Sequence, residues 1–146
     1  MNSLNWYMFF RELAYQIAEQ FRVLGKAMNL SECVVVGGRD FTSQTLALSR
    51  RPHVVIATPG RLADVLRTGS IEVNLKRLRF LVLDEADRLF DASFAEDVQL
   101  IYSHLGNQRQ TLLFSATLTP LVTEQTVLPL QDPMIFSANE AYVPCT

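Results

Sequence analysis

The residues of this chain that could do chemistry are acids placed at the end of an apolar run. "FLVLDEADRLF", residues 80–90, leads apolar side chains into Asp84, Glu85 and Asp87. Acids at a strand end suit a Mg²⁺ ion held through water near a nucleotide phosphate, with the glutamate orienting or deprotonating the attacking water. The same acids could instead complement the dipole of a following helix. Taken by themselves, they leave both interpretations open.

Small and hydroxylated residues follow the other predicted strands. These strand ends read "VGG" at 36–38, "ATPG" at 57–60 and "SAT" at 115–117. In a parallel sheet, ligands gather at the carboxyl ends of the strands. Within "TPGR", the free N–H groups of a helix start, the Thr58 hydroxyl and the Arg61 cation could bind phosphates. Alternatively, Pro and Gly could simply mark the start of a helix, which requires no ligand.

The elements that position these residues alternate between strands and helices. Apolar spacing and cap residues predict helices over residues 11–28, 40–49, 59–66, 94–105 and 119–128, with Asp40 as an N-cap and Pro59 in a first turn. Apolar runs predict strands within residues 33–38, 53–60, 79–85, 110–117 and 133–137. Strands that are apolar on both faces imply a parallel sheet with helices on both faces, an α/β fold.

Composition and charge are those of one globular domain. The chain has 146 residues, of which 49% are hydrophobic and 19% charged, and it contains no repeat or linker-like segment. Its net charge of −2 does not suggest a nucleic-acid binder, although RNA binding does not require a basic total. Cys33, Cys145 and the two histidines have no metal-ligand spacing, which favours a reducing compartment. The apolar opening is too short to span a bilayer and lacks the features of a signal peptide.

An ordered set of motifs resembles the first RecA-like domain of DEAD-box ATP-dependent RNA helicases, a fold of the P-loop NTPase type. "RELA" at 11–14 resembles part of motif Ia, Gly37-Gly38 the glycine doublet, "TPGR" at 58–61 motif Ib, "DEAD" at 84–87 motif II and "SAT" motif III. By chance, D-E-A-D would occur in roughly two or three chains per thousand of this length. The resemblance covers about residues 11–137.

The resemblance implies a role for each matching residue. Asp84 would hold Mg²⁺ through water, Glu85 would position water at the bound ATP, and Asp87 would accept hydrogen bonds from motif III. The motif III residues are Ser115 and Thr117, which would link the ATP site to the RNA face. The implied contacts to the backbone of single-stranded RNA, without sequence preference, are Arg11, Gly37, Gly38, Thr58, Pro59, Gly60 and Arg61. A tight turn and local backbone bonding are the alternative explanations for the glycines and hydroxyls.

Parts of the family's machinery have no counterpart in the chain. No glycine begins a G-x-x-x-x-G-K-[ST] phosphate loop, and the adenine-reading Gln motif and the second RecA-like domain with its arginine finger are missing. Because phosphoryl transfer depends on positioning and charge stabilisation, the chain alone is predicted to be inactive. We expect a single partial domain over 1–146, incomplete at its N-terminus. We expect an atypical leader over 1–10, and the start of an interdomain linker or an atypical tail over 138–146.

The missing phosphate-loop strand leads to a structural expectation. That strand is expected to be central and to neighbour the strand ending at Asp84, which would then have an open, apolar edge. The segment "NWYMFF", residues 5–10, could replace the motif Ia strand but not the central one. The acids Glu96 and Asp97 and the side chain of His104 are expected on solvated helix faces, and His53 has no identifiable partner.

Two functions from different classes fit these observations. The leading hypothesis is a segment of an ATP-dependent RNA helicase whose partners are RNA and, in the parent protein, the second RecA-like domain, with no membrane. "RELAYQIAEQF" and "HVVIATPGRLAD" look most like ribosome-assembly members, which suggests the nucleus or nucleolus, with the cytoplasm as the alternative. The second is a non-catalytic RNA- or protein-binding module derived from a helicase core. A DNA helicase or another RecA-like ATPase fits the motif set least.

Overall fold

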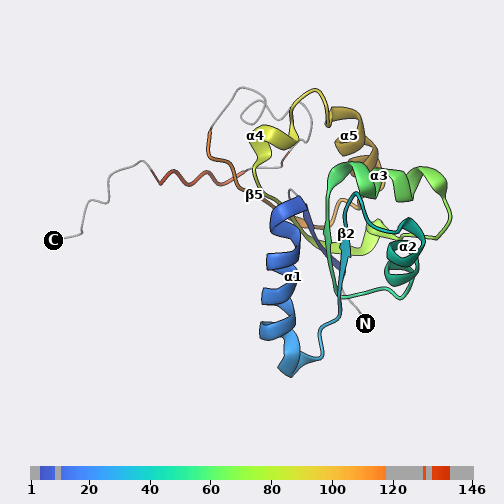
Figure 1. The fold of residues 1–146 in the computed structure, drawn as a ribbon. Coiled ribbons are helices and arrows are strands. Elements are labelled where there is room, and N and C mark those ends of the chain that lie inside the picture. Colours follow the sequence, from blue (N-terminus) through green and yellow to red (C-terminus); the bar gives the residue numbers. More distant parts are fainter. Residues whose placement is uncertain (1–3, 9–10, 118–129, 131–132, 139–146) are drawn as a thin grey trace.

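Parallel strands form the framework of the protein. The computed structural model describes residues 4–8, 11–117, 130 and 133–138, with the backbone alone for 4–8, 11 and 12. Within these residues, five strands form one sheet in the order β2-β3-β1-β4-β5 (Figure 1). They are β1 (Leu4–Met8), β2 (Glu32–Val35), β3 (Val54–Ala57), β4 (Leu78–Leu83) and β5 (Gln110–Leu113). Every pairing is parallel, which confirms the predicted α/β class.

Helices cover the two faces of the sheet. The helical elements are α1 (Arg11–Gly25), η1 (Lys26–Met28), α2 (Phe41–Ser49), α3 (Pro59–Thr68), η2 (Leu75–Arg77), α4 (Ala86–Leu89) and α5 (Ala95–Ser103). Helix α1 packs on one face, and α2, α3 and α5 pack on the other (Figure 1). The predicted Asp40 cap and the predicted helix start at Pro59 are confirmed, because the Asp40 carboxylate accepts the Ser43 N–H at 2.7 Å and Pro59 is the first residue of α3.

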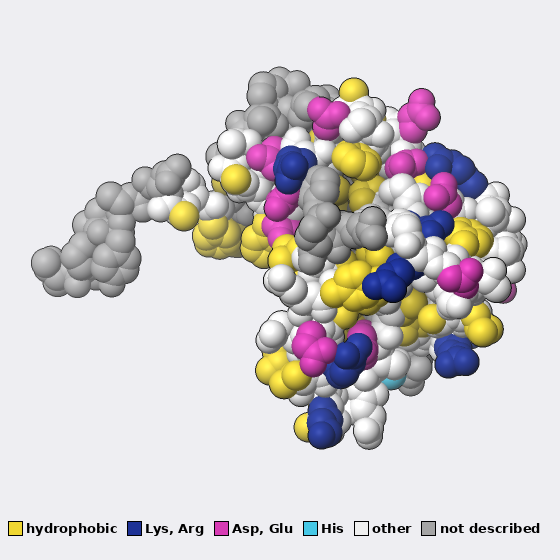
Figure 2. All heavy atoms as spheres, in the orientation of Figure 1, with side chains coloured by type: hydrophobic (Ala, Val, Ile, Leu, Met, Phe, Trp, Pro, Cys, Tyr) yellow, Lys and Arg dark blue, Asp and Glu magenta, His cyan; other side chains and the backbone are white. Residues whose placement is uncertain are grey.

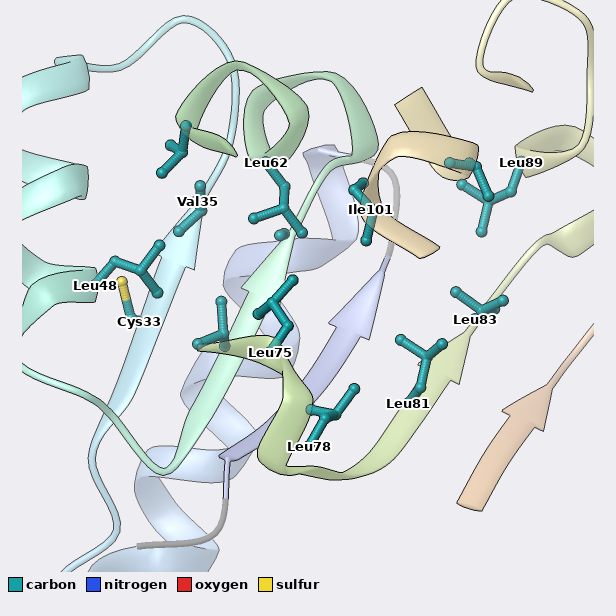
Figure 3. Packing of buried hydrophobic residues seen from close by; sticks show 14 of the residues in the cluster. Cys33, Val35, Leu48, Leu62, Leu75, Leu78, Leu81, Leu83, Leu89 and Ile101 are labelled. Atoms are coloured by element: carbon teal, nitrogen blue, oxygen red, sulfur yellow. The ribbon is translucent and has the colours of Figure 1, made fainter. Parts of the chain in front are cut away.

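Neighbouring residues of one strand contribute to opposite cores. Val54 and Ile56 of β3 pack with Ala14 and Ala18 of α1. The residues between and after them, such as Val55, join the larger core beneath α2, α3 and α5. Figure 3 shows this larger core, with labelled side chains from the sheet and from the helices above it. Because successive strand residues point to opposite faces, a strand covered on both sides must be apolar throughout.

Strand β1 lies at the centre of the described sheet. It pairs with β3 up to Met8 opposite Ala57, and with β4 up to Met8 opposite Leu83. The expectation that this segment could not form the central strand was therefore wrong. So was the expectation of an open edge on β4, because β5 pairs with its other side. Strand order depends on ladders between segments far apart in the chain, and a short apolar run does not reveal its neighbours.

The strand predicted near the C-terminus is wrong, and the helix predicted before it is not tested. Residues 133–137 do not form the predicted strand, and Met134, Ile135 and Phe136 are 69–86% exposed. An apolar run without a pairing partner has no ladder to join, so its pattern alone does not make it a strand. The predicted helix over 119–128 lies outside the described residues. In the part of the chain that the structure describes, no helix is both long enough and apolar enough to cross a membrane.

Candidate functional site

The carboxyl edge of the sheet gathers the predicted site residues into two groups. Gly37 and Gly38 come after β2 and Thr58 comes after β3, whereas Asp84 follows β4 and Ser115 lies just beyond β5. Strand β1 separates the two groups, since it lies between β3 and β4. At a strand spacing of about 4.8 Å, the ends of β3 and β4 are about 10 Å apart. One binding edge can therefore serve two ligands side by side.

The acidic sequence leaves β4 in a sharp turn. Glu85 has φ 51° and ψ 48°, in the left-handed region, and its N–H donates to Asp84 Oδ1 at 2.9 Å. The Glu85 carboxylate forms an ion pair with Arg88 at 2.8 Å. A non-glycine residue in this region is uncommon and costs conformational energy, and such residues cluster at functional sites. The turn leaves Asp84 half-buried at the strand end and engages Glu85 with a neighbouring cation.

Backbone hydrogen bonds tie the end of β5 to this turn. Phe114 donates its N–H to the carbonyl of Leu83 at 2.8 Å, and its own carbonyl accepts the N–H of Ala86 at 3.0 Å. These bonds bring the next residues of the chain alongside Asp87. Thr117 Oγ1 then donates to Asp87 Oδ2 at 2.6 Å, which is the contact between the two motifs that the resemblance implies.

Ser115 and Thr117 use their hydroxyls differently. Ser115 Oγ donates to the carbonyl of Thr117 at 2.7 Å and so supports the turn that carries the second hydroxyl. The hydrogen bond from Thr117 lowers the pKa of Asp87, the backbone N–H of Arg88 acts in the same direction, and partial burial opposes both. Asp87 is therefore held as a carboxylate that accepts hydrogen bonds.

The surroundings of Asp84 can be compared with what a Mg²⁺ ion requires. No group of three or more His, Cys, Asp or Glu side chains within the described residues is arranged to hold a metal by itself. Mg²⁺ does not require such a group, because it usually keeps several waters and binds through one or two carboxylates and substrate phosphates. Asp84 is half-buried at a strand end, and one of its oxygens accepts an N–H, which holds the carboxylate in place. This environment suits a water-mediated Mg²⁺.

Two side chains hold the loop that carries the glycine doublet. Gln44 Oε1 accepts the N–H of Val36 at 2.8 Å, and Gln44 Nε2 donates to the carbonyl of the same residue at 3.0 Å. Arg61 Nε donates to that carbonyl at 3.2 Å, and Arg61 Nη2 donates to the carbonyl of Arg39 at 2.5 Å. The guanidinium also lies 5.3 Å from the centre of the Phe41 ring. Arg61 therefore positions the loop and is not a free surface cation.

The role of Gln44 was not predicted from the sequence. The residue is 8% exposed, and its side-chain amide pairs with the N–H and the carbonyl of Val36 as a neighbouring strand would. The available signal was its spacing, because Gln44 lies one helical turn before the buried Leu48 and so shares its face of α2. A polar residue on a buried helix face needs hydrogen-bond partners, which the structure supplies.

The two glycines of the doublet differ in their backbone and surroundings. Gly38 has φ 74°, a conformation that side-chain-bearing residues rarely adopt. At Gly37 no atom outside the residue and its two chain neighbours lies within 4 Å of the position that a Cβ would take. The surface at Gly37 is therefore open enough for close approach of another backbone.

The helix start after β3 places the remaining predicted contacts. Thr58 is the N-cap of α3 and makes no side-chain cap hydrogen bond. Pro59 is buried in the first turn, and an added Cβ on Gly60 would meet Asp97 Oδ2 at 3.3 Å. Arg11 is the first residue of α1, and its side chain lies outside the described part.

Two residues expected to be unremarkable make specific contacts. Asp97 accepts a hydrogen bond from Arg67 Nη2 at 2.6 Å, so it joins α5 to α3 and is not on a solvated face as predicted. His53 Nδ1 accepts the N–H of Ser31 at 3.1 Å and lies 2.8 Å from its hydroxyl, so it has the partner that the sequence did not reveal. Both contacts join residues distant in the chain, which local patterns do not report.

Charged side chains of both signs are interspersed over the face shown in Figure 2. The net charge of −2 agrees with this mixture. A polyanion bound here would depend on backbone N–H groups, hydroxyls and individual cations, because the visible face carries no broad basic field.

Comparison with known proteins identifies the family. The family model described as "DEAD/DEAH box helicase" matches residues 10–125. The chain belongs to the DEAD/DEAH box helicase family. The matched range contains both groups of residues at the sheet edge, so the geometry described above is that of a DEAD/DEAH box helicase segment.

Relatives within this family extend well beyond the matched region. The mouse "Probable ATP-dependent RNA helicase DDX49" is 54% identical over 132 residues, which cover 88% of this chain and 27% of that protein. The Candida albicans "ATP-dependent RNA helicase DBP8" is 58% identical over 116 residues, 77% of this chain and 26% of that protein. The Yarrowia lipolytica "ATP-dependent rRNA helicase RRP3" is 47% identical over 132 residues, which cover 90% of this chain and 27% of that protein. The chain thus spans about a quarter of their length.

Solved structures of the family share the fold. A hypothetical ATP-dependent RNA helicase from Sulfolobus tokodaii superposes with a TM-score of 0.73 at 31% identity, covering 84% of this chain and 37% of that one. The yeast DEAD-box splicing factor Prp28 superposes with a TM-score of 0.74 at 27% identity, covering 87% and 31%. The RecA-like fold predicted from the motifs is thereby confirmed.

Replacing Gln44 by Leu should destabilise the DEAD-box domain. The Val36 carbonyl would keep its bond from Arg61, but the Val36 N–H would be left without an acceptor. We expect the free energy of unfolding to fall by about 1–3 kcal/mol, the usual cost of a buried unsatisfied donor, measured by urea denaturation. Gln16→Leu on the exposed side of α1 is the matched control and should change little. Equal stabilities for the two variants would show that the amide contacts are unimportant.

Replacing Thr117 by Val should raise the pKa of Asp87 toward its ordinary value of about 3.9. Because the wild-type pKa is lowered, the wild-type advantage is fully present above about pH 3.9 and is lost as the pH falls through the folded pKa. The variant should be the less stable at pH 7, with the difference shrinking in acid. Carboxyl NMR titration and urea unfolding at several pH values measure both effects. Thr42→Val is the control, and an unchanged Asp87 titration would contradict the assigned hydrogen bond.

Proposed function

We propose that this chain provides the metal-binding carboxylates and part of the RNA surface of an ATP-dependent RNA helicase. The whole protein would couple ATP hydrolysis to RNA binding and duplex unwinding. The observation that carries the proposal is the 2.6 Å hydrogen bond from Thr117 to Asp87, which joins motifs II and III in a member of the family. A contact between these two segments is what a link between nucleotide and RNA requires.

The nucleotide side of the proposal rests on the turn after β4. Asp84 would hold Mg²⁺ through water, and the ion would supply positive charge to neutralise the ATP phosphates. Glu85, which is paired with Arg88, is the carboxylate proposed to orient water. Asp87, Ser115 and Thr117 would form the link between the motifs, as their hydrogen bonds support.

The RNA side rests on the loop after β2 and the start of α3. Gly37 offers open backbone and Gly38 turns the chain with φ 74°. Thr58, Pro59 and Gly60 present a helix start whose free N–H groups suit phosphate. Arg11 is proposed to contribute at the start of α1. Arg61 would act by holding the loop through the carbonyls of Val36 and Arg39, in addition to any contact with RNA. Contacts of this kind read the sugar-phosphate chain and not the bases.

The proposed RNA substrate is ribosomal RNA, and the proposed location is the nucleus or nucleolus. It is supported by the 47% identity to a protein named "ATP-dependent rRNA helicase RRP3". The proposed partners are single-stranded RNA and a second RecA-like domain in the whole protein. The chain's sequence lacks the G-x-x-x-x-G-K-[ST] pattern, so ATP held at Asp84 would need phosphate contacts from outside this chain.

Gly37→Ala tests the RNA surface without disturbing the fold. No atom lies within 4 Å of the new Cβ and the residue does not have a positive φ, so the melting temperature should be unchanged. The methyl group would obstruct close approach of an RNA backbone, and we expect binding of a labelled single-stranded RNA to weaken on the order of tenfold, about 1.4 kcal/mol. Fluorescence anisotropy over a salt series measures this, with binding by the wild type weakening as salt rises. Equal affinities would remove this loop from the RNA surface.

ATP turnover by the chain alone should be undetectable. Catalysis of phosphoryl transfer depends on positioning and charge stabilisation by parts that this sequence does not contain. A phosphate-release assay with saturating RNA and Mg²⁺ measures it, and Glu85→Gln is the control for a contaminating ATPase. Hydrolysis that RNA stimulates and that Glu85→Gln abolishes would overturn the prediction. A non-catalytic binding module would also bind RNA without ATP turnover. The helicase segment and the binding module are therefore distinguished by adding the remainder of the helicase as a separate chain and measuring turnover again.

A further inference from the structure

Arg39 is a surface cation next to the glycine doublet that no motif includes. Its guanidinium lies 5.6 Å from the centre of the Tyr15 ring on α1, and Tyr15 is 43% exposed. We propose that Arg39, seated on Tyr15, is a further phosphate contact for single-stranded RNA beside the Gly37-Gly38 loop. This inference rests on the proposed RNA-binding function and extends its surface from the sheet edge onto α1.

The backbone on both sides of Arg39 is held in place. Its carbonyl accepts the bond from Arg61 at 2.5 Å, and Gly38 before it turns the chain with φ 74°. Asp40 after it caps α2 through the N–H of Ser43. The side chain therefore leaves a fixed point of the loop, and the aromatic ring restrains its far end. A cation ordered before binding loses less conformational entropy when it meets a phosphate.

The charge of Arg39 is not neutralised by an acid in the described residues. Arg22, Arg67 and Arg88 each have a carboxylate partner at 2.6–2.9 Å, whereas none of the ion pairs of the described part includes Arg39. The nearest acid in sequence, Asp40, is engaged as an N-cap. A free cation beside an open glycine backbone is the combination that a phosphate chain requires, because the glycine permits approach and the cation supplies the charge.

Tyr15 links this loop to the other proposed contact on α1. It lies one helical turn after Arg11, about 6 Å along the axis. Tyr15 therefore lies one turn from the start of α1, and its ring contacts the loop after β2 through Arg39. Tyr15 is a positioning residue in this proposal, since it acts on RNA through Arg39.

The test compares two arginines that flank α2. Arg39→Ala should weaken binding of the labelled single-stranded RNA about tenfold at moderate salt and reduce the slope of log K against log salt by about 0.7. Arg50→Ala removes the same charge at the other end of α2, about 14 Å away along a nine-residue helix. We expect Arg50→Ala to leave the affinity and the slope nearly unchanged. Arg39→Lys should keep the slope, because it keeps the charge.

Variants of the ring separate a positioning role from a structural one. Tyr15→Phe should bind RNA like the wild type, because the ring remains. Tyr15→Leu should weaken binding several-fold without changing the salt slope, because the charge remains but is no longer seated. If Tyr15→Leu changed the affinity for RNA as little as Arg50→Ala does, the positioning role of Tyr15 would be wrong. Melting temperatures of all variants are measured alongside, and unchanged values are expected because these side chains are exposed.

The outcomes distinguish this inference from the proposed function. If Gly37→Ala weakens RNA binding and Arg39→Ala behaves like Arg50→Ala, the further contact is wrong and the proposed RNA surface stands. If the wild-type chain does not bind single-stranded RNA, both fail together. If Arg39→Ala lowers both the affinity and the salt slope while Arg50→Ala does not, Arg39 is an RNA phosphate contact.

Discussion

The arrangement of the site depends on one constraint, the pairing of β1 with β3 on one side and with β4 on the other. Met8 pairs with Ala57 on one side and with Leu83 on the other. Thr58 and Asp84 each follow directly, so the start of the "TPGR" helix and the first acid of "DEAD" leave the sheet at the same level. A shift of one residue in either ladder would move one of these strand ends relative to the other and exchange the two faces of its strand. Parallel pairing about one central strand therefore sets the spacing between the proposed RNA and nucleotide groups.

Each group is then held by hydrogen bonds that do not belong to the sheet. Beyond β4, the Phe114 backbone bridges Leu83 and Ala86, and Thr117 reaches Asp87 from the same segment. Beyond β2, the side chain of Gln44 performs the corresponding task for the loop at Val36. Sites supported in this way are preorganised, because loops fixed at several points lose little entropy when a ligand binds.

The structure also separates the position of a motif residue from its role. Arg61 belongs to "TPGR", yet its guanidinium donates to two backbone carbonyls of the neighbouring loop. Arg39 belongs to no motif, yet it carries a charge without an acid partner among the described ion pairs and rests on an aromatic ring. A guanidinium has several donors and can donate to carbonyls or to phosphates, so its partner within the chain is decided by what the fold places nearby.

The sequence by itself determined the α/β class, the parallel strands and the strand-end positions of "VGG", "TPGR", "DEAD" and "SAT". These features depend on local patterns such as the apolar run of β3 and the Asp40 cap, which a short window contains. Only the tertiary structure decided that β1 is central, that Arg61 points to the loop, and that Asp97 and His53 have partners. Those contacts join residues 22 to 30 positions apart or pair strands across the sheet. Their energies arise only when distant segments meet, and no local pattern of residues encodes which segments those are.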